Sequence, residues 1–563
     1  MKMSLESVDF FEECWELVFR FLGQGHYLES VSMVCKQFLS ITNQLHLSLT
    51  IFDSTTRFLP QLFLRFSRLK TLDLSHFSGD LQGLLHQIIQ SGLDLDLLNL
   101  SNQRTLPLDG LRELGSKMIN LKVFICSNIG SLHDSHLIVI AYCFPLLEEL
   151  DISFPLNSQA SDFGIFRLSS LLENLRKINL SGNYLITDKS LISLCQNCLS
   201  LEEISFFTCF RVTQSGIAAA IRLRPSLTSV AFNIEKKRLH RSGLTLISIN
   251  SDLIDSVRSL KRLSAIDLSN SFISDELLFS IADGCGVILR KLVLQDCCNC
   301  SFAGISYLLS KCQSVRCLDL RKVDFLTDEC ISKFCMFLHN LTSINLSGCC
   351  QLTNSAFFIL TQNCPMLIEI NMERTYLGVE GLDGYYFLMD FSVNNHQVKN
   401  VYLGDNVLLD DASLTKFASI CPSLQLLDLN ACEGISGECI VEVLNKCCEI
   451  RHLNLAYTRV KLFEIEFQVS KLEVLNLSGS RINDEALSVI SRRFCGLVLL
   501  EIHSCSDVTD KGVREVIENC IALKELNLKN CSLVCDDFVA WSEFSRPSSL
   551  RKIITPSGVA VNF

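Results

Sequence analysis

Asp and Asn side chains recur at one position of a repeated phrase, and they are the first residues here that could do chemistry. They stand between two apolar residues, at Asp73, Asn99, Asp151, Asn179, Asp267, Asp319, Asn345, Asn371, Asp428, Asn454, Asn476 and Asn527. A row of carboxylates could act as general acid and base or hold a metal ion. No nucleophile with an orienting partner accompanies this row. We therefore expect these residues to solvate the open face of a sheet, whose strands lie about 4.8 Å apart.

Cysteine is the second residue type that could carry chemistry, and the chain has 28 of them. Cys297, Cys298 and Cys300 resemble part of a zinc site, but zinc needs four ligands and no second pair is evident nearby. Two columns of cysteine flank the apolar phrase, Cys143, Cys198, Cys285, Cys312, Cys364, Cys421, Cys447 and Cys520 before it and Cys209, Cys297, Cys349, Cys432, Cys505 and Cys531 after it. We expect reduced thiols that pack as small apolar side chains, not disulfides.

The elements that position these residues follow a phrase that is clearest from Leu175 onward. It reads L-x-x-L-x-L, then a bend, then Thr187 and Asp188, then a helical stretch. Leu175, Ile178 and Leu180 point inward and alternate with outward residues, as a strand requires. The phrase begins at Leu69, Leu95, Leu121, Leu147, Leu175, Leu201, Leu227, Leu263, Leu289, Val315, Leu341, Leu367, Val398, Leu424, Ile450, Leu472, Leu497 and Leu523. Most starts are 26 residues apart, and this period is typical of leucine-rich repeats with one strand and one helix each.

The repeat predicts an α/β fold, a leucine-rich-repeat solenoid (horseshoe) of about 18 repeats over residues 46–563. A first strand is expected within residues 47–52. A short polar residue before Asp should cap each helix, because its side chain can accept a bond from the free amides of the first turn. Such caps are expected at Thr187, Ser274, Thr327, Asn483 and Thr509.

Three departures from the period mark places where function could lie. Residues 227–263 hold about ten extra positions, including the basic segment Lys236–Arg241. That segment could bind phosphate or an acidic partner, or it could be a solvated loop. Residues 367–398 hold about five extra positions, including an aromatic run at 385–389. The unit over 450–472 is short, which predicts an incomplete helix.

Composition and charge exclude several classes of function. The net charge of −11 argues against a general nucleic-acid binder, which needs a basic surface. No run approaches the roughly 20 apolar residues that span a bilayer. The polar start at residues 1–9 lacks the features of a signal peptide. We expect no nucleic-acid or membrane partner, and a cytoplasmic or nuclear location.

Residues 8–42 do not follow the repeat. Apolar residues lie at helical spacing on each side of a break at Gly23 and Gly25. About 40 residues are too few to build a large core alone. A helical module with this much apolar surface should dock on another protein or domain. Its helices contain the apolar residues Leu17, Val18, Phe21, Leu22, Leu28, Val31, Val34, Cys35 and Phe38.

This module resembles an F-box. The resemblance rests on Glu12-Glu13 before an amphipathic helix, on the Leu17, Phe19, Phe21 and Leu22 pattern, and on Val34-Cys35-Lys36. Phe11 stands where the family has Pro, and Phe38 stands where it has Trp. With the repeats behind it, the whole chain resembles the F-box/leucine-rich-repeat proteins, most closely the cysteine-containing, plant-type members.

The resemblance implies an F-box over residues 1–45 and a solenoid over 46–563. It implies a non-catalytic substrate-recognition subunit of an SCF-type (Skp–cullin–F-box) ubiquitin ligase, which presents target proteins for ubiquitination and proteasomal degradation. A Skp-type adaptor, and through it a cullin, would be partners, with the adaptor bound by Leu17, Val18, Phe21, Leu22, Val31, Val34 and Phe38.

The target is expected to bind outward aromatic, imidazole and basic side chains, because such residues are enriched where interfaces bind tightly. The candidates are Phe207, Arg321, Arg374, Tyr402, Tyr457 and His503.

Two alternatives stay open, a repeat scaffold without a ligase link and an intracellular receptor for a hormone-like small molecule. We expect no cofactor and no metal. The inositol phosphate held by hormone-receptor relatives is not carried over, because the basic residues here are scattered and the chain is acidic.

Overall fold

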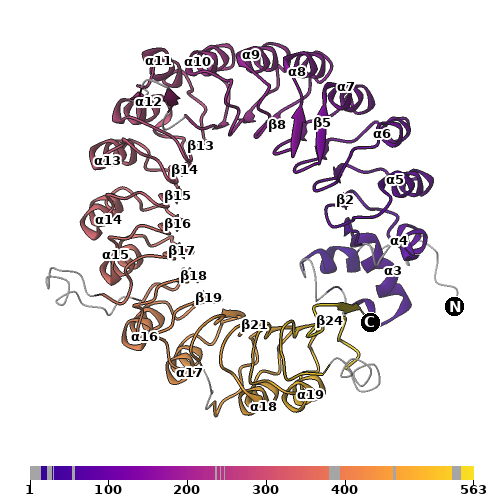
Figure 1. Cartoon of the computed structure of the whole chain (residues 1–563), viewed down its shortest axis with the longest axis vertical. Coiled ribbons are helices and arrows are strands. Elements are labelled where there is room, and N and C mark those ends of the chain that lie inside the picture. The colour runs from indigo at the N-terminus through magenta and orange to yellow at the C-terminus, as the bar shows by residue number, and fades with distance from the viewer. Residues whose placement is uncertain are drawn as a thin grey trace. The chain divides into compact units, whose positions relative to one another are not determined.

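A computed structural model describes residues 14–21, 28, 31–52, 57–234, 238–240, 243–245, 248–379, 394–460, 465–535 and 547–562. The chain divides into two compact units. The first comprises residues 1–233 and 248–263, and the second comprises 234–247 and 264–563. The division falls at the longer of the two predicted insertions, where the regular spacing of the repeats is interrupted. In each unit the helices follow one side of the strands (Figure 1).

The first unit is built on a parallel sheet. Its successive strands are β1 (Ser48–Thr50), β2 (Thr71–Asp73), β3 (Leu97–Asn99), β4 (Val123–Ile125), β6 (Glu149–Asp151), β8 (Lys177–Asn179), β9 (Glu203–Ser205) and β10 (Ser229–Ala231). A smaller parallel pair joins β5 (Ser131–His133) to β7 (Asn157–Gln159). The helices are α3 (Lys36–Leu45), α4 (Leu59–Arg65), α5 (Leu81–Gln90), α6 (Leu108–Gly115), α7 (Asp134–Cys143), α8 (Asp162–Ser169), α9 (Asp188–Asn197), α10 (Gln214–Leu223) and α11 (Ser251–Val257).

The second unit repeats this design. Its parallel strands are β13 (Ala265–Asp267), β14 (Lys291–Val293), β15 (Cys317–Asp319), β16 (Ser343–Asn345), β17 (Glu369–Asn371), β18 (Asn400–Tyr402), β19 (Leu426–Asp428), β20 (His452–Asn454), β21 (Val474–Asn476), β22 (Leu499–Glu501), β23 (Glu525–Asn527) and β24 (Lys552–Ile554). Strand β25 (Ala560–Asn562) pairs antiparallel with β24. The helices are α12 (Asp275–Cys285), α13 (Phe302–Lys311), α14 (Asp328–Cys335), α15 (Asn354–Asn363), α16 (Asp411–Ile420), α17 (Gly437–Lys446), α18 (Asp484–Arg493) and α19 (Asp510–Asn519).

The predicted α/β leucine-rich-repeat fold is confirmed. Each of the predicted phrase starts is followed two residues later by a parallel strand, and β1 lies within the segment expected for the first strand. The central apolar residue of each phrase is buried, and register stacks it on its neighbours, as at Leu150, Ile178 and Ile204. Period-two alternation therefore sends one set of side chains into the core and leaves the other on the open face of the sheet.

The predicted helix caps are confirmed. The capping side chain accepts a hydrogen bond from a backbone N–H of the first turn at Thr187, Ser274, Thr327, Asn483 and Thr509. Each bond satisfies one of the amides that a helix start leaves without an intrahelical acceptor.

The Asp after each cap has a second role that the spacing alone did not reveal. The Asp188 carboxylate accepts hydrogen bonds from the backbone N–H and the hydroxyl of Thr213 in the next repeat, both at 2.7 Å. Asp162 accepts the equivalent pair from Thr187. Gly216 leaves the space for this contact, since a Cβ there would lie 2.1 Å from the Asp188 carboxylate. These bonds fix the register between neighbouring helices.

The cysteines after the strands hold carbonyls of the preceding repeat. Cys209 donates its thiol to the Leu180 carbonyl at 3.4 Å, and Cys349 donates to the Leu320 carbonyl at 3.2 Å. Asn183 occupies the same position in another repeat, and its amide donates to the carbonyls of Ile152 and Leu180. At this position either an Asn amide or a Cys thiol therefore donates a hydrogen bond to a buried carbonyl of the preceding repeat. All 28 cysteines are free thiols.

Alkaline pH should weaken the fold through these thiols. Burial raises the pKa of Cys349 to about 12 from an ordinary value of 9.0. The thiol ionises in the unfolded chain near pH 9.0 but stays protonated in the folded chain, so stability present below that pH is lost as pH rises, by up to about 1.4 kcal/mol per pH unit for each such cysteine. Melting temperatures at pH 7.5 and pH 10 should therefore differ less in Cys349→Ala than in the wild type. Cys350→Ala is the control, because the Cys350 thiol is exposed. An equal reduction of the melting-temperature difference in Cys350→Ala would contradict the role given to the buried Cys349 thiol.

The structure describes the three segments that depart from the 26-residue period to different extents. The basic segment contributes β11 (Arg238–His240), which pairs antiparallel with β12 (Gly243–Thr245) to form a hairpin; its side chains lie outside the described residues. The aromatic run at 385–389 also lies outside them. The described part of the short unit, residues 455–460 and 465–471, contains no helix, in agreement with its spacing. No described helix is long and apolar enough to cross a membrane.

Candidate functional site

The N-terminal module has a small aromatic core. Phe19, Leu28 and Ile41 are buried, and Val31, Phe38 and Leu45 pack against them. The Phe38 ring centroid lies 4.9 Å from those of both Trp15 and Phe19. Phe38 thus supplies packing within the module, as does Val31, although both were predicted to bind the adaptor.

A second apolar set in the same module faces solvent. Residues 14–21 are helical, and the last of them, Phe21, is 92% exposed. Leu17, Val18 and Val34 are about half to two-thirds exposed, at 57%, 49% and 67%. Met33, which sequence reasoning did not single out although it adjoins Val34, is 78% exposed. We call Leu17, Val18, Phe21, Met33 and Val34 the module face. Leu22 lies outside the described residues.

The module is joined to the first repeat by polar contacts. Arg65 of α4 donates to the Asn43 side chain of α3 at 2.8 Å, and Arg68 lies 3.8 Å from the carboxylate of Glu16. Helix α3 ends at Leu45 and β1 begins at Ser48, so the predicted domain boundary falls in this short connection. These contacts hold the module against the repeats.

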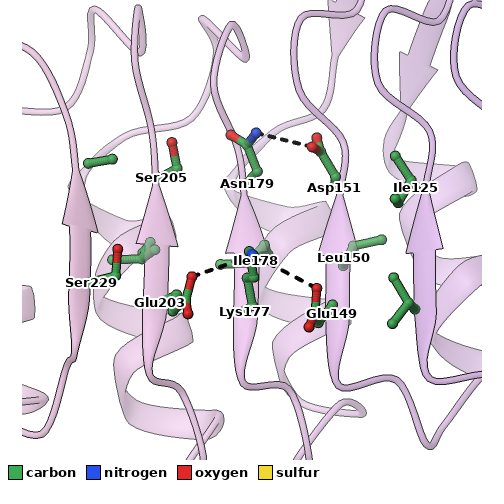
Figure 2. Close-up of a pocket in the computed structure, with 13 residues that line it drawn as sticks. Ile125, Glu149, Leu150, Asp151, Lys177, Ile178, Asn179, Glu203, Ser205 and Ser229 are labelled. Carbon is green, nitrogen blue, oxygen red and sulfur yellow. Dashed lines mark hydrogen bonds and ion pairs between the residues drawn. The ribbon is translucent and has the colours of Figure 1, made fainter. Parts of the chain in front are cut away.

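The open face of the first sheet carries a lysine that pairs with carboxylates on both neighbouring strands. Lys177 of β8 lies 3.9 Å from Glu149 of β6 and 3.5 Å from Glu203 of β9. In the row above, Asn179 donates to the Asp151 carboxylate at 3.2 Å. Figure 2 shows these side chains lining one shallow hollow. Each of these carboxylates contacts a side chain of a neighbouring strand. The hollow therefore suits the surface of a protein partner better than acid–base chemistry.

The predicted target-binding residues are not all brought together. Phe207 belongs to the first unit, where it lies half-buried just after β9. In the second unit the Arg321 guanidinium binds both carboxylate oxygens of Asp319, with its Nη2 2.7 Å from Oδ2. Arg374 donates to Asp405 at 2.9 Å. Both arginines are therefore engaged within the unit.

Two predicted residues form one pair on the second unit. The Tyr457 and His503 rings meet edge to face with centroids 6.2 Å apart. Tyr457 has a positive φ of 57° and lies over Gly479, where a Cβ would be 2.5 Å from the Tyr457 ring. Glycine at 479 therefore makes room for an exposed aromatic ring, of the kind that serves as an anchor at protein interfaces.

Tyr402 stands in the row that Asp and Asn fill in most repeats. Register places it between Asn371 of β17 and Asp428 of β19. Partial burial raises the pKa of the Tyr402 phenol, and the charges of Glu369, Asp428 and Glu373 raise it further. The ring therefore lies in a negative electrostatic environment.

The cysteine cluster that resembled a zinc site has another explanation. Cys297 donates its thiol to the Leu268 carbonyl at 3.0 Å, as its column does in other repeats. Burial raises the pKa of the Cys300 thiol to about 12 from an ordinary value of 9.0. Within the described ranges, no group of three or more His, Cys, Asp or Glu side chains is arranged to hold a metal ion.

Comparison with known proteins gives local sequence matches. No family model matches the chain. Over 192 residues the chain is 26% identical to F-box/LRR-repeat protein 4 of Bos taurus, which covers 32% of this chain and 30% of that protein. Over 156 residues it is 28% identical to Antagonist of mitotic exit network protein 1 of Eremothecium gossypii, which covers 27% of this chain and 38% of that protein. The chain thus spans under two fifths of either relative. The first match supports the F-box/leucine-rich-repeat resemblance.

Solved structures give weak global likenesses. The yeast Rad7 and Elc1 complex aligns with 84% of this chain and 98% of that chain at 16% identity and a TM-score of 0.45. The TLR13–ssRNA13 complex aligns with 83% and 72% at 16% identity and a TM-score of 0.44. These likenesses carry no argument about function.

Proposed function

We propose that this chain is a non-catalytic substrate-recognition subunit of an SCF-type ubiquitin ligase. The module binds a Skp-type adaptor, the adaptor joins a cullin, and the open faces of the repeats bind the target protein. Another subunit transfers ubiquitin, so this chain contributes proximity and orientation. The complex acts in the cytoplasm or nucleus, where thiols stay reduced. The buried cysteine columns favour the cysteine-containing, plant-type subclass.

One observation carries the proposal, the module face beside a separate aromatic core. Phe19 and Phe38 account for the packing of the module, so Phe21, Met33 and Val34 are not needed for its core. An apolar set that a small module leaves in water marks a protein-interaction site. The match with an F-box/LRR-repeat protein supports an adaptor as the occupant.

The test uses the full chain and purified partners. A Skp-type adaptor should co-elute with the chain in size-exclusion chromatography, and addition of a cullin should shift the pair to a three-component complex. Failure of the intact, folded chain to bind any Skp-type adaptor would contradict the ligase assignment and leave the repeat scaffold as the better account. Adaptor binding that excludes cullin would contradict it as well.

A further inference from the structure

Three neighbouring strands of the second unit, β17, β18 and β19, place an aromatic ring and acidic side chains together on the open face. Tyr402 of β18 lies beside Asn371 of β17 and Asp428 of β19, at the strand spacing of about 4.8 Å. Glu369 and Glu373 come two residues before and after Asn371. We call Glu369, Glu373, Tyr402 and Asp428 the Tyr402 face. The Tyr402 ring therefore has carboxylates on the strands at both of its sides, β17 and β19.

These carboxylates differ from Glu149, Glu203 and Asp319, which have basic partners on the open faces. Glu149 and Glu203 share Lys177, and Asp319 is bound by Arg321. Glu369, Glu373 and Asp428 form no ion pair with any described residue. Their hydrogen bonds come from neutral donors: the Ser343 hydroxyl to Glu369 at 3.0 Å, the Asn371 amide to Glu373 at 3.5 Å, and the Asn454 amide to Asp428 at 2.8 Å.

The arginines near this face are held by other carboxylates, although, beside the hydrogen bond to Asp319, the charge of Glu373 also contributes to the raised pKa of Arg321. Arg374 donates to Asp405 at 2.9 Å, and Arg321 is bound by both oxygens of Asp319. Lys399 is exposed and precedes β18, at the amino-terminal edge of the sheet. Partial burial and the charges of the three carboxylates raise the pKa of the Tyr402 phenol, as expected for a ring in a negative field.

An apolar strip continues the face along the neighbouring strands. Leu426, Val474 and Leu499 hold the earlier outward position of β19, β21 and β22, and each is half-buried. His452 of β20 lies among them in register. A segment of a partner that crosses these strands would meet a negative, aromatic zone first and an apolar strip beside it.

We propose that the Tyr402 face docks a Lys or Arg side chain from an exposed basic segment of a partner protein. The cation lies against the Tyr402 ring and between the carboxylates of Glu369, Glu373 and Asp428. An aromatic face and carboxylates attract a cation together, and each gains strength as the partner excludes water. The inference rests on the proposed function and deepens it, because it names the chemical class of the target: an exposed basic segment with adjoining apolar residues.

The test is a peptide selection on the full-length chain. A degenerate library of 12-residue peptides is passed over immobilised chain, and the retained peptides are sequenced against the input. Lys and Arg should be enriched in the peptides that wild type retains. Glu369→Gln with Asp428→Asn should reduce that enrichment by about tenfold or more, and Tyr402→Leu should also reduce it, whereas Tyr402→Phe should preserve it.

A matched variant separates this face from the general acidity of the chain. Glu149→Gln with Glu203→Gln also removes two charges, but from carboxylates that Lys177 already engages, and it should leave the enrichment unchanged. An equal loss in both double variants would overturn the proposal. So would retained peptides without Lys or Arg enrichment, or acidic ones. Melting curves of each variant confirm folding.

Adaptor binding is scored separately on the same preparations. A chain that binds the adaptor but selects no basic peptides contradicts this inference alone. A chain that selects basic peptides but binds no adaptor contradicts the ligase assignment and leaves the Tyr402 face supported.

Discussion

Phe21→Asp combined with Val34→Asp is expected to abolish adaptor binding while the chain stays folded. Phe21 is 92% exposed and Val34 is 67% exposed, so neither side chain is needed for the core that Phe19, Leu28 and Ile41 form. Placing two carboxylates in a desolvated apolar interface removes two anchors and buries charge without partners. At about 2 kcal/mol or more for each anchor, affinity should fall by roughly a thousandfold.

Adaptor affinity is measured by titration calorimetry, and folding by circular dichroism. Leu156→Asp is the matched control, because Leu156 is an apolar residue of the same unit that is 84% exposed and lies outside the module. That variant should bind the adaptor as wild type does. Wild-type affinity in the Phe21 and Val34 double variant would show that the module face is not the adaptor site. A Phe38→Asp variant is a poor substitute, since Phe38 packs on Trp15 and Phe19.

Replacing Asn406 with Ala should destabilise the second unit by about 3 to 5 kcal/mol, among the larger costs of a single substitution. Asn406 is fully buried. Its amide donates to the carbonyls of Met372 and Leu403, each at 2.8 Å, and its oxygen accepts from the Thr375 backbone N–H at 2.9 Å. Alanine would leave the buried Thr375 N–H without its acceptor, and the Met372 and Leu403 carbonyls would each lose one of two donors, the others being the Thr375 hydroxyl and the Cys432 thiol. It would also open a small cavity beside them.

Asn406→Cys is the informative control. In neighbouring repeats Cys holds the equivalent position, where Cys432 donates to the Leu403 carbonyl at 3.1 Å. Cysteine at 406 should therefore recover one of the lost bonds and cost roughly half as much as alanine. Hydrogen exchange over residues 372–409 reads out this local loss, because repeats open in parts rather than all at once. Equal protection in Asn406→Ala and wild type would contradict the role given to this amide.

Much of the fold could be predicted because the chain repeats one local rule. The spacing of Leu175, Ile178 and Leu180 sets which side chains are buried, and a polar residue such as Thr187 sets where a helix starts. Both effects act within a few residues, so they can be read from the order of residues alone. The same logic explained the cysteine columns as buried thiols, which left no need for a metal or disulfide.

Interactions between repeats could not be read in this way, because they join residues of neighbouring repeats, such as Asp188 and Thr213, which are 25 positions apart. Spacing showed Asp188 only as the residue after a cap. It showed Tyr402 as an outward aromatic, but not that Glu369 and Asp428 flank it without cations. It also grouped Phe38 with Phe21, whereas Phe38 is partly buried against the module's core and Phe21 is exposed.

The sequence by itself determined the repeat, the inward and outward alternation, the helix starts and the module at the N-terminus, since each depends on local periodicity. Only the tertiary structure decided which outward charges are neutralised and which are left for a partner. The physical reason is that the electrostatic state of a side chain depends on its neighbours across strands, as Lys177 between Glu149 and Glu203 and Tyr402 beside Asp428 show.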